Sequence, residues 1–395
     1  MNTLRHDFDL DAQRRGTDAK KYDPSIVPND VIPMWIADTD FTCPQPIVDA
    51  LVKRASMPHY GYLYLSNDFQ KAIIRWNEVR FGWKGLSVDM IEFVPCIIPG
   101  MIYAIREFSN MGDKVVIQTP VYPPFHDAVK NNGRQLVHNP LVLKDGRYEI
   151  DFEDLEIKLK DIRTKIFIIC NPQNPTGRVF SREELEKMAN LCLKYDVLMF
   201  SDEIHEDLVY SGNKHIPLAS ISEEIAQNSI TFINPAKTFN IAGFRTAAVI
   251  IPNLKIKKAF HEAALKNKAI GRNIFGDVAL ITAYNECDYY ADQIIEYLEE
   301  TRDMMVEFFE TRIPKIKMIK PESNFLVWLD CRELGFENQA EIKAFFKEVA
   351  KLELNDGTSF GFEEGKGFMR MNIAAPRAVV VEALERLERA VKTLA

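Results

Sequence analysis

Five short apolar runs recur between helical patterns in this chain, and they constrain its fold more than any other feature. The runs are KVVIQTP from residue 114, KIFIICNP from 165, VLMFSDE from 197, ITFINP from 230 and AAVIIP from 247. Runs of this length that are rich in β-branched residues are typical of buried strands. Because they alternate with helical segments, we expect an α/β fold in which helices cover both faces of a mostly parallel sheet.

The segment SREELEKMANLCLKY, residues 181–195, supports the helical part of this prediction. Ser181 and Glu184 have the spacing of a capping box, in which each side chain bonds the other residue's backbone N–H at the start of a helix. Four later residues share one helical face: Leu185, Met188, Cys192 and Tyr195.

The pattern changes after about residue 285. A long charged helical stretch is followed by the apolar runs SNFLVWLD and GFMRMNIA and then by a final amphipathic helix. The apolar residues of this final helix recur at helical spacing and share one face: Val380, Leu384, Leu387, Val391 and Leu394. We therefore expect a large domain of residues 46–285 and a smaller α+β domain of residues 1–45 and 286–395.

Composition argues against two classes of function. A net charge of −8 at pH 7 disfavours a protein that works by neutralising the phosphates of nucleic acid. No uninterrupted apolar stretch is long enough to cross a membrane, and the first 16 residues lack the apolar segment of a secretory signal, so we expect a cytoplasmic protein. The cysteines form no C-x-x-C pair and are predicted to be reduced, packed thiols: Cys43, Cys96, Cys170, Cys192, Cys287 and Cys331.

Polar residues stand at the ends of four of the predicted strands. They are Tyr122 after the first run, Asn171 and Asn174 after the second, residues 202–205 after the third and residues 234–237 after the fourth. In open α/β sheets, ligands bind beyond the carboxyl ends of the strands, where the connecting loops converge. The sequence therefore predicts one site built from four strand ends.

Lys237 is the first candidate for chemistry at this site. Most lysines are solvated, so an ordinary surface residue is the default interpretation. Lys237, however, follows a predicted buried strand and opens onto the proposed site. A lysine in such surroundings can have a lowered pKa and act as a nucleophile that forms a Schiff base with an aldehyde cofactor.

Asp202 and the loop NPQNPTG, residues 171–177, each allow two interpretations. Asp202 is either a helix cap or a buried carboxylate that must pair with a cation. A protonated pyridine nitrogen would meet that need, and an electron-sink cofactor requires such a partner. The loop is either a turn-rich connection or a rigid support that holds Asn174 over a ligand.

Together these residues resemble the fold-type-I pyridoxal-phosphate enzymes of the class I/II aminotransferase superfamily. The motifs occur in the expected order along nearly the whole chain: YGY at 60, TPVYPPF at 119, NPQNPTG at 171, SDEIH at 201, KTFNIAGFR at 237 and RMNIAAPR at 370. The segments PMWIADTDF at 33, SDEIH and KTFNIAG are most similar to the cystathionine β-lyase-like branch, the carbon–sulfur lyases.

The resemblance implies pyridoxal 5′-phosphate as cofactor, bound by residues 46–285, and a homodimer whose subunits share their active sites. Lys237 would be the catalytic lysine, covalently linked to the cofactor and later moving the Cα proton of the substrate. The other cofactor contacts that the resemblance implies are Cys96, Ile97, Ile98, Tyr122, Asn174, Asp202, His205, Asn234, Arg245 and Tyr62 of the partner subunit. The substrate contacts that it implies are Arg370, Asn174 and Tyr60.

The resemblance also implies a reaction, with alternatives. His205 is typical of the lyase branch, which implies β-elimination on L-cysteine S-conjugates such as cystathionine to give a thiol (homocysteine), pyruvate and ammonia. Ala236 and Arg245 are more typical of aminotransferases, and transamination between an L-amino acid and a 2-oxo acid is the first alternative. The second alternative is a regulatory protein that keeps the cofactor and acts through a protein partner.

Overall fold

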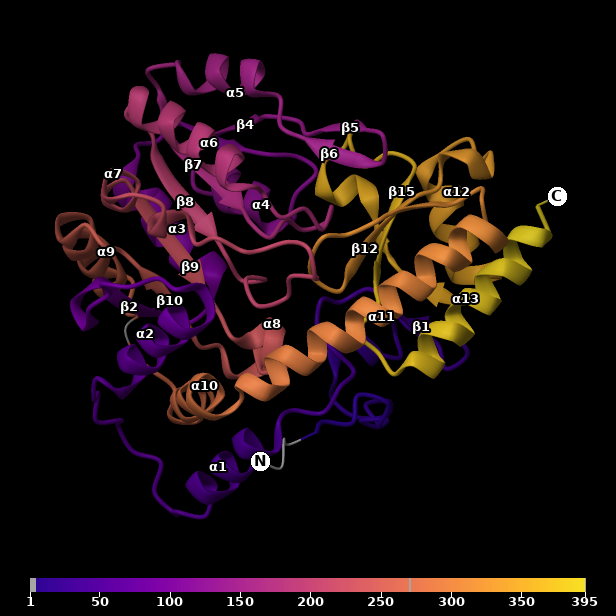
Figure 1. Ribbon diagram of the computed structural model, residues 1–395, viewed down its shortest axis with the longest axis horizontal. Coiled ribbons are helices and arrows are strands. Elements are labelled where there is room, and N and C mark those ends of the chain that lie inside the picture. Colours follow the sequence, from indigo (N-terminus) through magenta and orange to yellow (C-terminus); the bar gives the residue numbers. More distant parts are fainter. Residues whose placement is uncertain (1–4, 270, 395) are drawn as a thin grey trace.

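The computed structural model describes residues 5–269 and 271–394. Residues 1–4 and 395, in the predicted smaller domain, and residue 270, in the predicted larger one, lie outside the described residues. A seven-stranded sheet with the order β2-β10-β9-β8-β7-β3-β4 lies in the left half of the molecule as drawn in Figure 1. Its strands are β2 (Ile91–Val94), β3 (Lys114–Ile117), β4 (Gln135–His138), β7 (Thr164–Cys170), β8 (Leu198–Asp202), β9 (Ser229–Ile233) and β10 (Ala247–Ile250).

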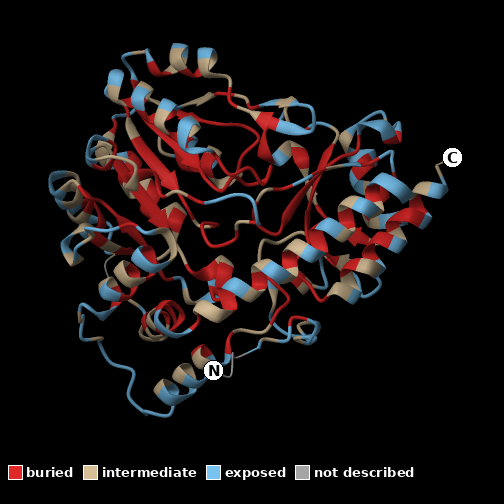
Figure 2. Ribbon diagram, in the orientation of Figure 1, coloured by how far each residue is buried: buried red, intermediate tan, exposed pale blue. Residues whose placement is uncertain are grey.

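Strands β4, β3, β7, β8 and β9 pair in parallel, whereas β10 is antiparallel to both β9 and β2. The predicted α/β fold with a mostly parallel sheet is thereby confirmed, and each of the five apolar runs contributes one strand. Most residues of these strands are buried, as the red arrows of Figure 2 show.

Helices pack on both faces of this sheet because successive strand residues point to opposite sides. In β3, Val115 and Ile117 pack with the core formed by α3 (Ile97–Phe108), α4 (Pro124–Lys130) and α9 (Leu254–Lys266). Val116 packs on the other face, with α5 (Phe152–Leu159) and α6 (Arg182–Lys194). The predicted capping box opens α6, where Ser181 N donates to Glu184 at 2.8 Å.

A second sheet lies in the C-terminal part of the chain and is antiparallel throughout. Its order is β11 (Lys317–Ile319), β12 (Leu326–Asp330), β15 (Phe368–Asn372) and β14 (Asn355–Asp356). The long helix α11 (Asp288–Arg312) runs beside the final helix α13 (Arg377–Lys392) (Figure 1). The start of the predicted apolar face of α13 is fully buried: Val380, Leu384 and Leu387.

The N-terminal part of the chain joins the C-terminal part through β1 (Ile32–Pro33), which pairs in parallel with β13 (Leu352–Glu353). Helices α1 (Gln45–Ala55) and α2 (Asp68–Phe81) pack against α10 (Ile274–Glu286). The domain division near residues 45 and 285 stays a prediction.

The remaining elements are shorter. They are a hairpin of β5 (Val142–Lys144) and β6 (Arg147–Glu149), and helices α7 (Glu223–Gln227), α8 (Ala236–Phe239) and α12 (Gln339–Ala344). All six cysteines are free thiols. No helix among the described residues combines the length and the apolar character needed to cross a bilayer.

Candidate active site

A cavity of about 220 Å³ lies where strands β7, β8 and β9 end and where helix α3 begins. Its wall includes most of the residues that the sequence nominated: Cys96, Ile97, Ile98, Tyr122, Asn174, Asp202, His205, Asn234 and Lys237. Ile204 and Ala236, from two of the predicted strand ends, also line it, and three groups that the sequence did not nominate complete it: Ala37, Cys170 and Ala242. The four predicted strand ends therefore meet at one cavity.

Lys237 reaches this cavity from α8, the short helix that follows β9. Asn234 begins the turn by accepting the backbone N–H of Ala236 at 2.9 Å, and Asn240, with a φ of 56°, ends the helix. The Nζ of Lys237 donates a hydrogen bond to the carbonyl of Ala37. Burial, helped by the nearby charge of Arg370, lowers the pKa of Lys237 to about 8, so the amine is a competent nucleophile near neutral pH.

Asp202 is the last residue of β8 and is 3% exposed. Its Oδ1 accepts the backbone N–H of Ile204 at 3.2 Å, and no cation of the described chain forms an ion pair with it. Burial, more than any other cause, raises the pKa of Asp202 to about 7. This carboxylate therefore has the surroundings that a cationic ring nitrogen would stabilise.

Arg370 comes from β15 in the second sheet and is 4% exposed. Its Nη1 donates to Asn174 Oδ1 at 3.0 Å and its Nη2 to the carbonyl of Trp35 at 2.9 Å. Its Nε has no hydrogen-bond partner, and the described residues offer it no carboxylate. Because burial lowers the pKa of Arg370 to about 10, a bound carboxylate would relieve an uncompensated buried charge.

Asn174 is held by a loop whose polar groups bond to one another. Gln173 donates from Nε2 to the carbonyl of Pro120 at 2.6 Å and accepts the N–H of Thr176 at 2.9 Å. The peptide bonds before Pro172 and Pro175 are cis. The Oδ1 of Asn174 is taken by Arg370, while its Nδ2 donates to no described residue and is free for a ligand.

The start of α3 offers hydrogen-bond donors of the kind that bind anions. Cys96 is the N-cap residue and its side chain makes no capping bond, so the first N–H groups of the helix, at Ile97 and Ile98, stay available beside the cavity. The N–H of Gly100 donates to the carbonyl of Cys96 at 3.2 Å and is therefore used within the helix. Arg245 is exposed, has a φ of 50° and is absent from the cavity wall.

His205 and Tyr122 contribute rings to the cavity. His205 is 1% exposed, and its Nδ1 has no hydrogen-bond partner. Burial, followed by the charges of Lys237 and Arg370, lowers the pKa of His205 well below its usual value, so its imidazole is neutral. Burial, followed by the charge of Asp202, raises the pKa of the Tyr122 hydroxyl.

Besides Arg245 and Arg370, two nominated residues are absent from the cavity wall of this single chain. The side chain of Tyr62 is fully exposed, and the hydroxyl of Tyr60 donates to the carbonyl of Ala55 at 2.6 Å. The contacts that sequence reasoning missed are the carbonyls of Trp35 and Ala37. The motif PMWIADTDF could have pointed to them, but its residues served only as a family signature.

Comparison with known proteins gives consistent results. Residues 37–387 match the family described as aminotransferase class I and II. Cystathionine beta-lyase PatB of Bacillus subtilis is 40% identical over 387 residues, which cover 97% of this chain and 99% of that protein. Cystalysin of Treponema denticola, whose crystal structure contains pyridoxal 5′-phosphate, superimposes with a TM-score of 0.96 at 35% identity, covering 99% of this chain and 100% of its own. The pyridoxal-phosphate-bound C–S lyase of Staphylococcus hominis superimposes with a TM-score of 0.91 at 30% identity, covering 98% of both chains.

Proposed function

The chain belongs to the family of class I and II aminotransferases, and from this premise we propose that it is a pyridoxal-phosphate-dependent carbon–sulfur β-lyase. It acts on L-cysteine S-conjugates such as cystathionine and releases a thiol, homocysteine in that case, with pyruvate and ammonia. The observation that carries the proposal is the meeting of Lys237 and Asp202 at one cavity. The lyase and cystathionase names of similar proteins select this reaction within the family.

The cavity fits pyridoxal 5′-phosphate in three respects. Asp202, buried without a cationic partner, would pair with the protonated ring nitrogen. The uncapped start of α3 would bind the phosphate. Asn174 Nδ2 would donate to the 3-oxygen of the ring, and Tyr122 would lie against its face. When bound, this cofactor withdraws electrons from the substrate carbon that loses its proton.

Lys237 moves that proton in the proposed reaction. Its lowered pKa leaves part of its Nζ population uncharged at neutral pH, so Nζ can accept a proton from the substrate Cα. The apolar side chains of Ile98 and Ile204 line the same space and exclude water from it.

Arg370 orients the substrate. Its guanidinium binds the α-carboxylate as a two-pronged pair, while its contacts with Asn174 and Trp35 fix the direction of the side chain. The amino acid is thereby held with its Cα near Lys237, which lowers the entropic cost of proton transfer.

The assembly that we propose is a homodimer in which Tyr62 of the partner subunit completes each phosphate site. Support comes from the exposure of Tyr60, Tyr62 and Tyr64 along one loop, because clustered exposed aromatic residues are typical of interfaces. Arg245 would add a cation to the phosphate site. Six free thiols fit a reducing compartment, and we propose a cytoplasmic location.

The deciding experiment supplies the cofactor-loaded protein with cystathionine alone and, separately, with an amino acid plus 2-oxoglutarate. We expect pyruvate and a free thiol in equal amounts without any added oxo acid. A new amino acid formed only when the oxo acid is present would instead make the chain an aminotransferase.

Lys237→Ala is the matched control, because it removes the amine and should abolish pyruvate release. An inactive wild type that binds a stoichiometric protein partner, in a manner that Lys237→Ala leaves unchanged, would support the regulatory alternative.

A further inference from the structure

Residues 35–41, named here the 35–41 segment, border the cavity through Ala37. The carbonyl of Ala37 accepts a hydrogen bond from Lys237 Nζ, and the carbonyl of Trp35 accepts one from Arg370 Nη2 at 2.9 Å. One short stretch of backbone therefore contacts both functional cations of the site.

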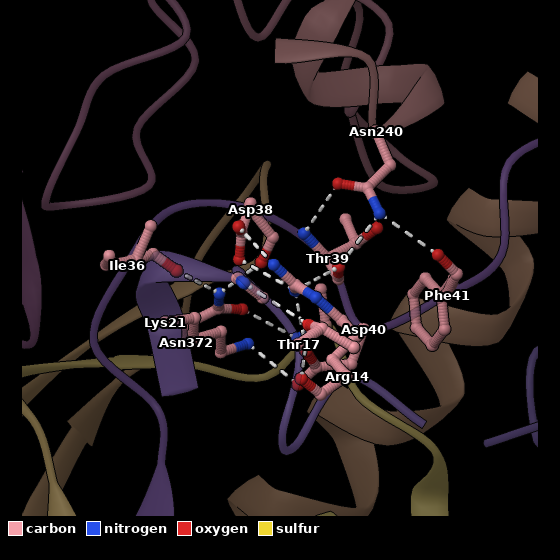
Figure 3. Close-up of polar contacts among 12 residues, drawn as sticks. Arg14, Thr17, Lys21, Ile36, Asp38, Thr39, Asp40, Phe41, Asn240 and Asn372 are labelled. Carbon is pink, nitrogen blue, oxygen red and sulfur yellow. Dashed lines mark hydrogen bonds and ion pairs between the residues drawn. The ribbon is translucent and has the colours of Figure 1, made fainter. Parts of the chain in front are cut away.

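Two asparagines bind the same segment from the elements that carry those cations (Figure 3). Asn240 follows Lys237 by three residues, and its Nδ2 donates to two carbonyls of the segment, each at 3.0 Å. Asn372 follows Arg370 by two residues in β15, and its Nδ2 donates to two further carbonyls at 2.5 and 2.6 Å. The segment is thus bonded to α8 and to β15 at more than one point each.

Ion pairs also hold the segment (Figure 3). The guanidinium of Arg14 lies 2.7 Å from Asp38 and 2.8 Å from Asp40. The Nζ of Lys21, a side chain that is 1% exposed, lies 2.8 Å from the second oxygen of Asp40. The indole of Trp35 donates a hydrogen bond to the carbonyl of Lys21 at 3.0 Å. Residues 14–21 therefore contact the segment near its start, at Trp35, and near its end, at Asp40.

We propose that Arg14 and Lys21 are positioning residues which, by fixing the 35–41 segment, set the separation between the Lys237 amine and the Arg370 guanidinium. The inference rests on the proposed function, in which one group moves the Cα proton and the other holds the carboxylate of the same substrate. Lys237 follows a strand of the seven-stranded sheet, whereas Arg370 belongs to the other sheet. Neither sheet alone fixes the distance between them, and the segment is bonded to both.

A purely stabilising role for these ion pairs is the rival explanation. Buried ion pairs contribute little net stability, but removing one partner is costly because it leaves the other charge buried and alone. A single substitution therefore lowers stability under either explanation. Lys21→Met leaves Asp40, which is 6% exposed, with Arg14 as its remaining partner. Removing Lys21 and the charge of Asp40 together separates the two explanations, because it leaves no carboxylate short of a cation and still deprives the segment of its contact with Lys21, while the pair of Arg14 with Asp38 stays.

The experiment compares Lys21→Met with the double variant K21M/D40N, using steady-state kinetics with cystathionine and thermal unfolding of the cofactor-loaded protein. We expect stability to fall in Lys21→Met and to recover in the double variant. The value of kcat/KM should stay about 100-fold below wild type in both, because the reacting groups are misplaced. The control Lys114→Met breaks the ion pair of Lys114 with Asp161 at the start of β3 and should keep the wild-type kcat/KM.

Recovery of kcat/KM together with stability in the double variant would overturn the proposal. If the double variant does not fold, Arg14→Lys decides, since lysine keeps the charge but lacks the planar fork that contacts both Asp38 and Asp40. A lowered kcat/KM in that variant supports positioning, and an unchanged value rejects it.

A failure of the proposed function can be told apart from a failure of this inference, because the wild type itself would then release no pyruvate. Hydrogen exchange then tests the positioning role without turnover. The backbone amides of the 35–41 segment should exchange faster in K21M/D40N than in wild type and should be unchanged in Lys114→Met. Equal exchange in all three proteins would contradict the inference.

Discussion

At the scale of single residues, burial brings the two central ionisable groups of the cavity close to neutral pH from opposite directions. It lowers the pKa of Lys237 to about 8 and raises that of Asp202 to about 7, because a buried site disfavours both charged forms. Each group then changes its charge in response to a modest change in its surroundings. That sensitivity suits a site whose groups must exchange protons and pair with a ligand.

Asp202→Asn tests this balance in the cofactor-free protein. The pKa of Asp202 is raised from 3.8 to about 7 on folding, so its contribution to stability is present below pH 3.8 and is lost as the pH rises to about 7. At pH 8 the full cost, on the order of 4 kcal/mol, applies to the wild type and is absent from the variant. Denaturant unfolding should therefore find Asp202→Asn more stable than wild type at pH 8.

The same substitution should weaken cofactor binding, because a neutral amide cannot neutralise a protonated ring nitrogen. Titration of the cofactor-free proteins with pyridoxal 5′-phosphate, followed by visible absorbance, measures this effect. An Asp202→Asn protein that binds the cofactor as tightly as wild type would show that Asp202 does not form the pair.

At the scale of elements, the position of helix α3 depends on Gly100. A Cβ atom at this position would lie 2.9 Å from Val94 Cγ1 and 3.1 Å from Val94 Cβ, closer than packed atoms tolerate. Valine has few rotamers with which to give way. Since the N-terminal turn of α3 carries the proposed phosphate site, a shift of the helix would move those N–H groups.

Gly100→Ala should therefore weaken the binding of pyridoxal 5′-phosphate more than it weakens folding. The double variant Gly100→Ala with Val94→Ala creates space for the new methyl group and should restore much of the affinity. Calorimetric titration of the cofactor-free proteins gives the comparison. If Val94→Ala does not restore cofactor affinity in the double variant, contact with Val94 is not the cause of the weaker binding.

Elements with strong local signals are the ones that the sequence predicted. The apolar runs form strands β3, β7, β8, β9 and β10, and the capping box of Ser181 and Glu184 opens α6. Strands β2 and β4 were not among the predicted strands, because Glu92 interrupts the apolar residues of β2 and the polar residues Gln135 and His138 flank the two apolar residues of β4. Strand order and the antiparallel direction of β10 follow from tertiary packing, which no local pattern contains.

The residues of the candidate site also divide into those that the sequence could predict and those that it could not. Side chains at the ends of parallel strands were predictable, because those ends share one edge of the sheet. Arg370 comes from the other sheet and was nominated by family resemblance alone. The carbonyls of Trp35 and Ala37 were missed because every residue has a carbonyl, so only the motif PMWIADTDF around them indicates their segment.

At the scale of the whole molecule, the proposed dimer can be tested by complementation. Lys237→Ala lacks the amine, and Tyr62→Ala lacks the ring that would enter the neighbouring site. If Tyr62 of the partner subunit completes each site, a hybrid dimer of the two variants contains one site with both residues intact. Mixing and refolding the two inactive proteins should then restore pyruvate release, whereas either variant alone stays inactive.

If pyruvate release does not return in isolated hybrid dimers, Tyr62 lies outside the neighbouring site. A hybrid prepared from wild type and Lys237→Ala is the control. It confirms that exchange of subunits leaves one competent site.

Three buried carboxylates follow strand β8, and they differ in their hydrogen-bond partners. Glu203 pairs with His215 at 2.9 Å, and Asp207 accepts a hydrogen bond from Thr238 at 2.9 Å. Glu206 is 4% exposed, and its Oε2 has no hydrogen-bond partner. Burial first, then the charges of Asp207 and Glu203, raise the pKa of Glu206 well above its usual value.

Glu206→Gln should change how the stability of the whole molecule depends on pH. A carboxyl whose pKa is raised on folding stabilises the protein below its unfolded pKa of 4.5, and this contribution is lost as the pH rises through the folded pKa. Within that window the wild type should lose about 1.4 kcal/mol per pH unit more than the variant, which binds no proton there. Unfolding free energies from pH 4 to pH 9 should therefore diverge in favour of Glu206→Gln, while the exposed control Glu337→Gln follows the wild type. Parallel curves for wild type and Glu206→Gln would mean that Glu206 keeps its charge on folding, and that a neighbouring group compensates it in solution.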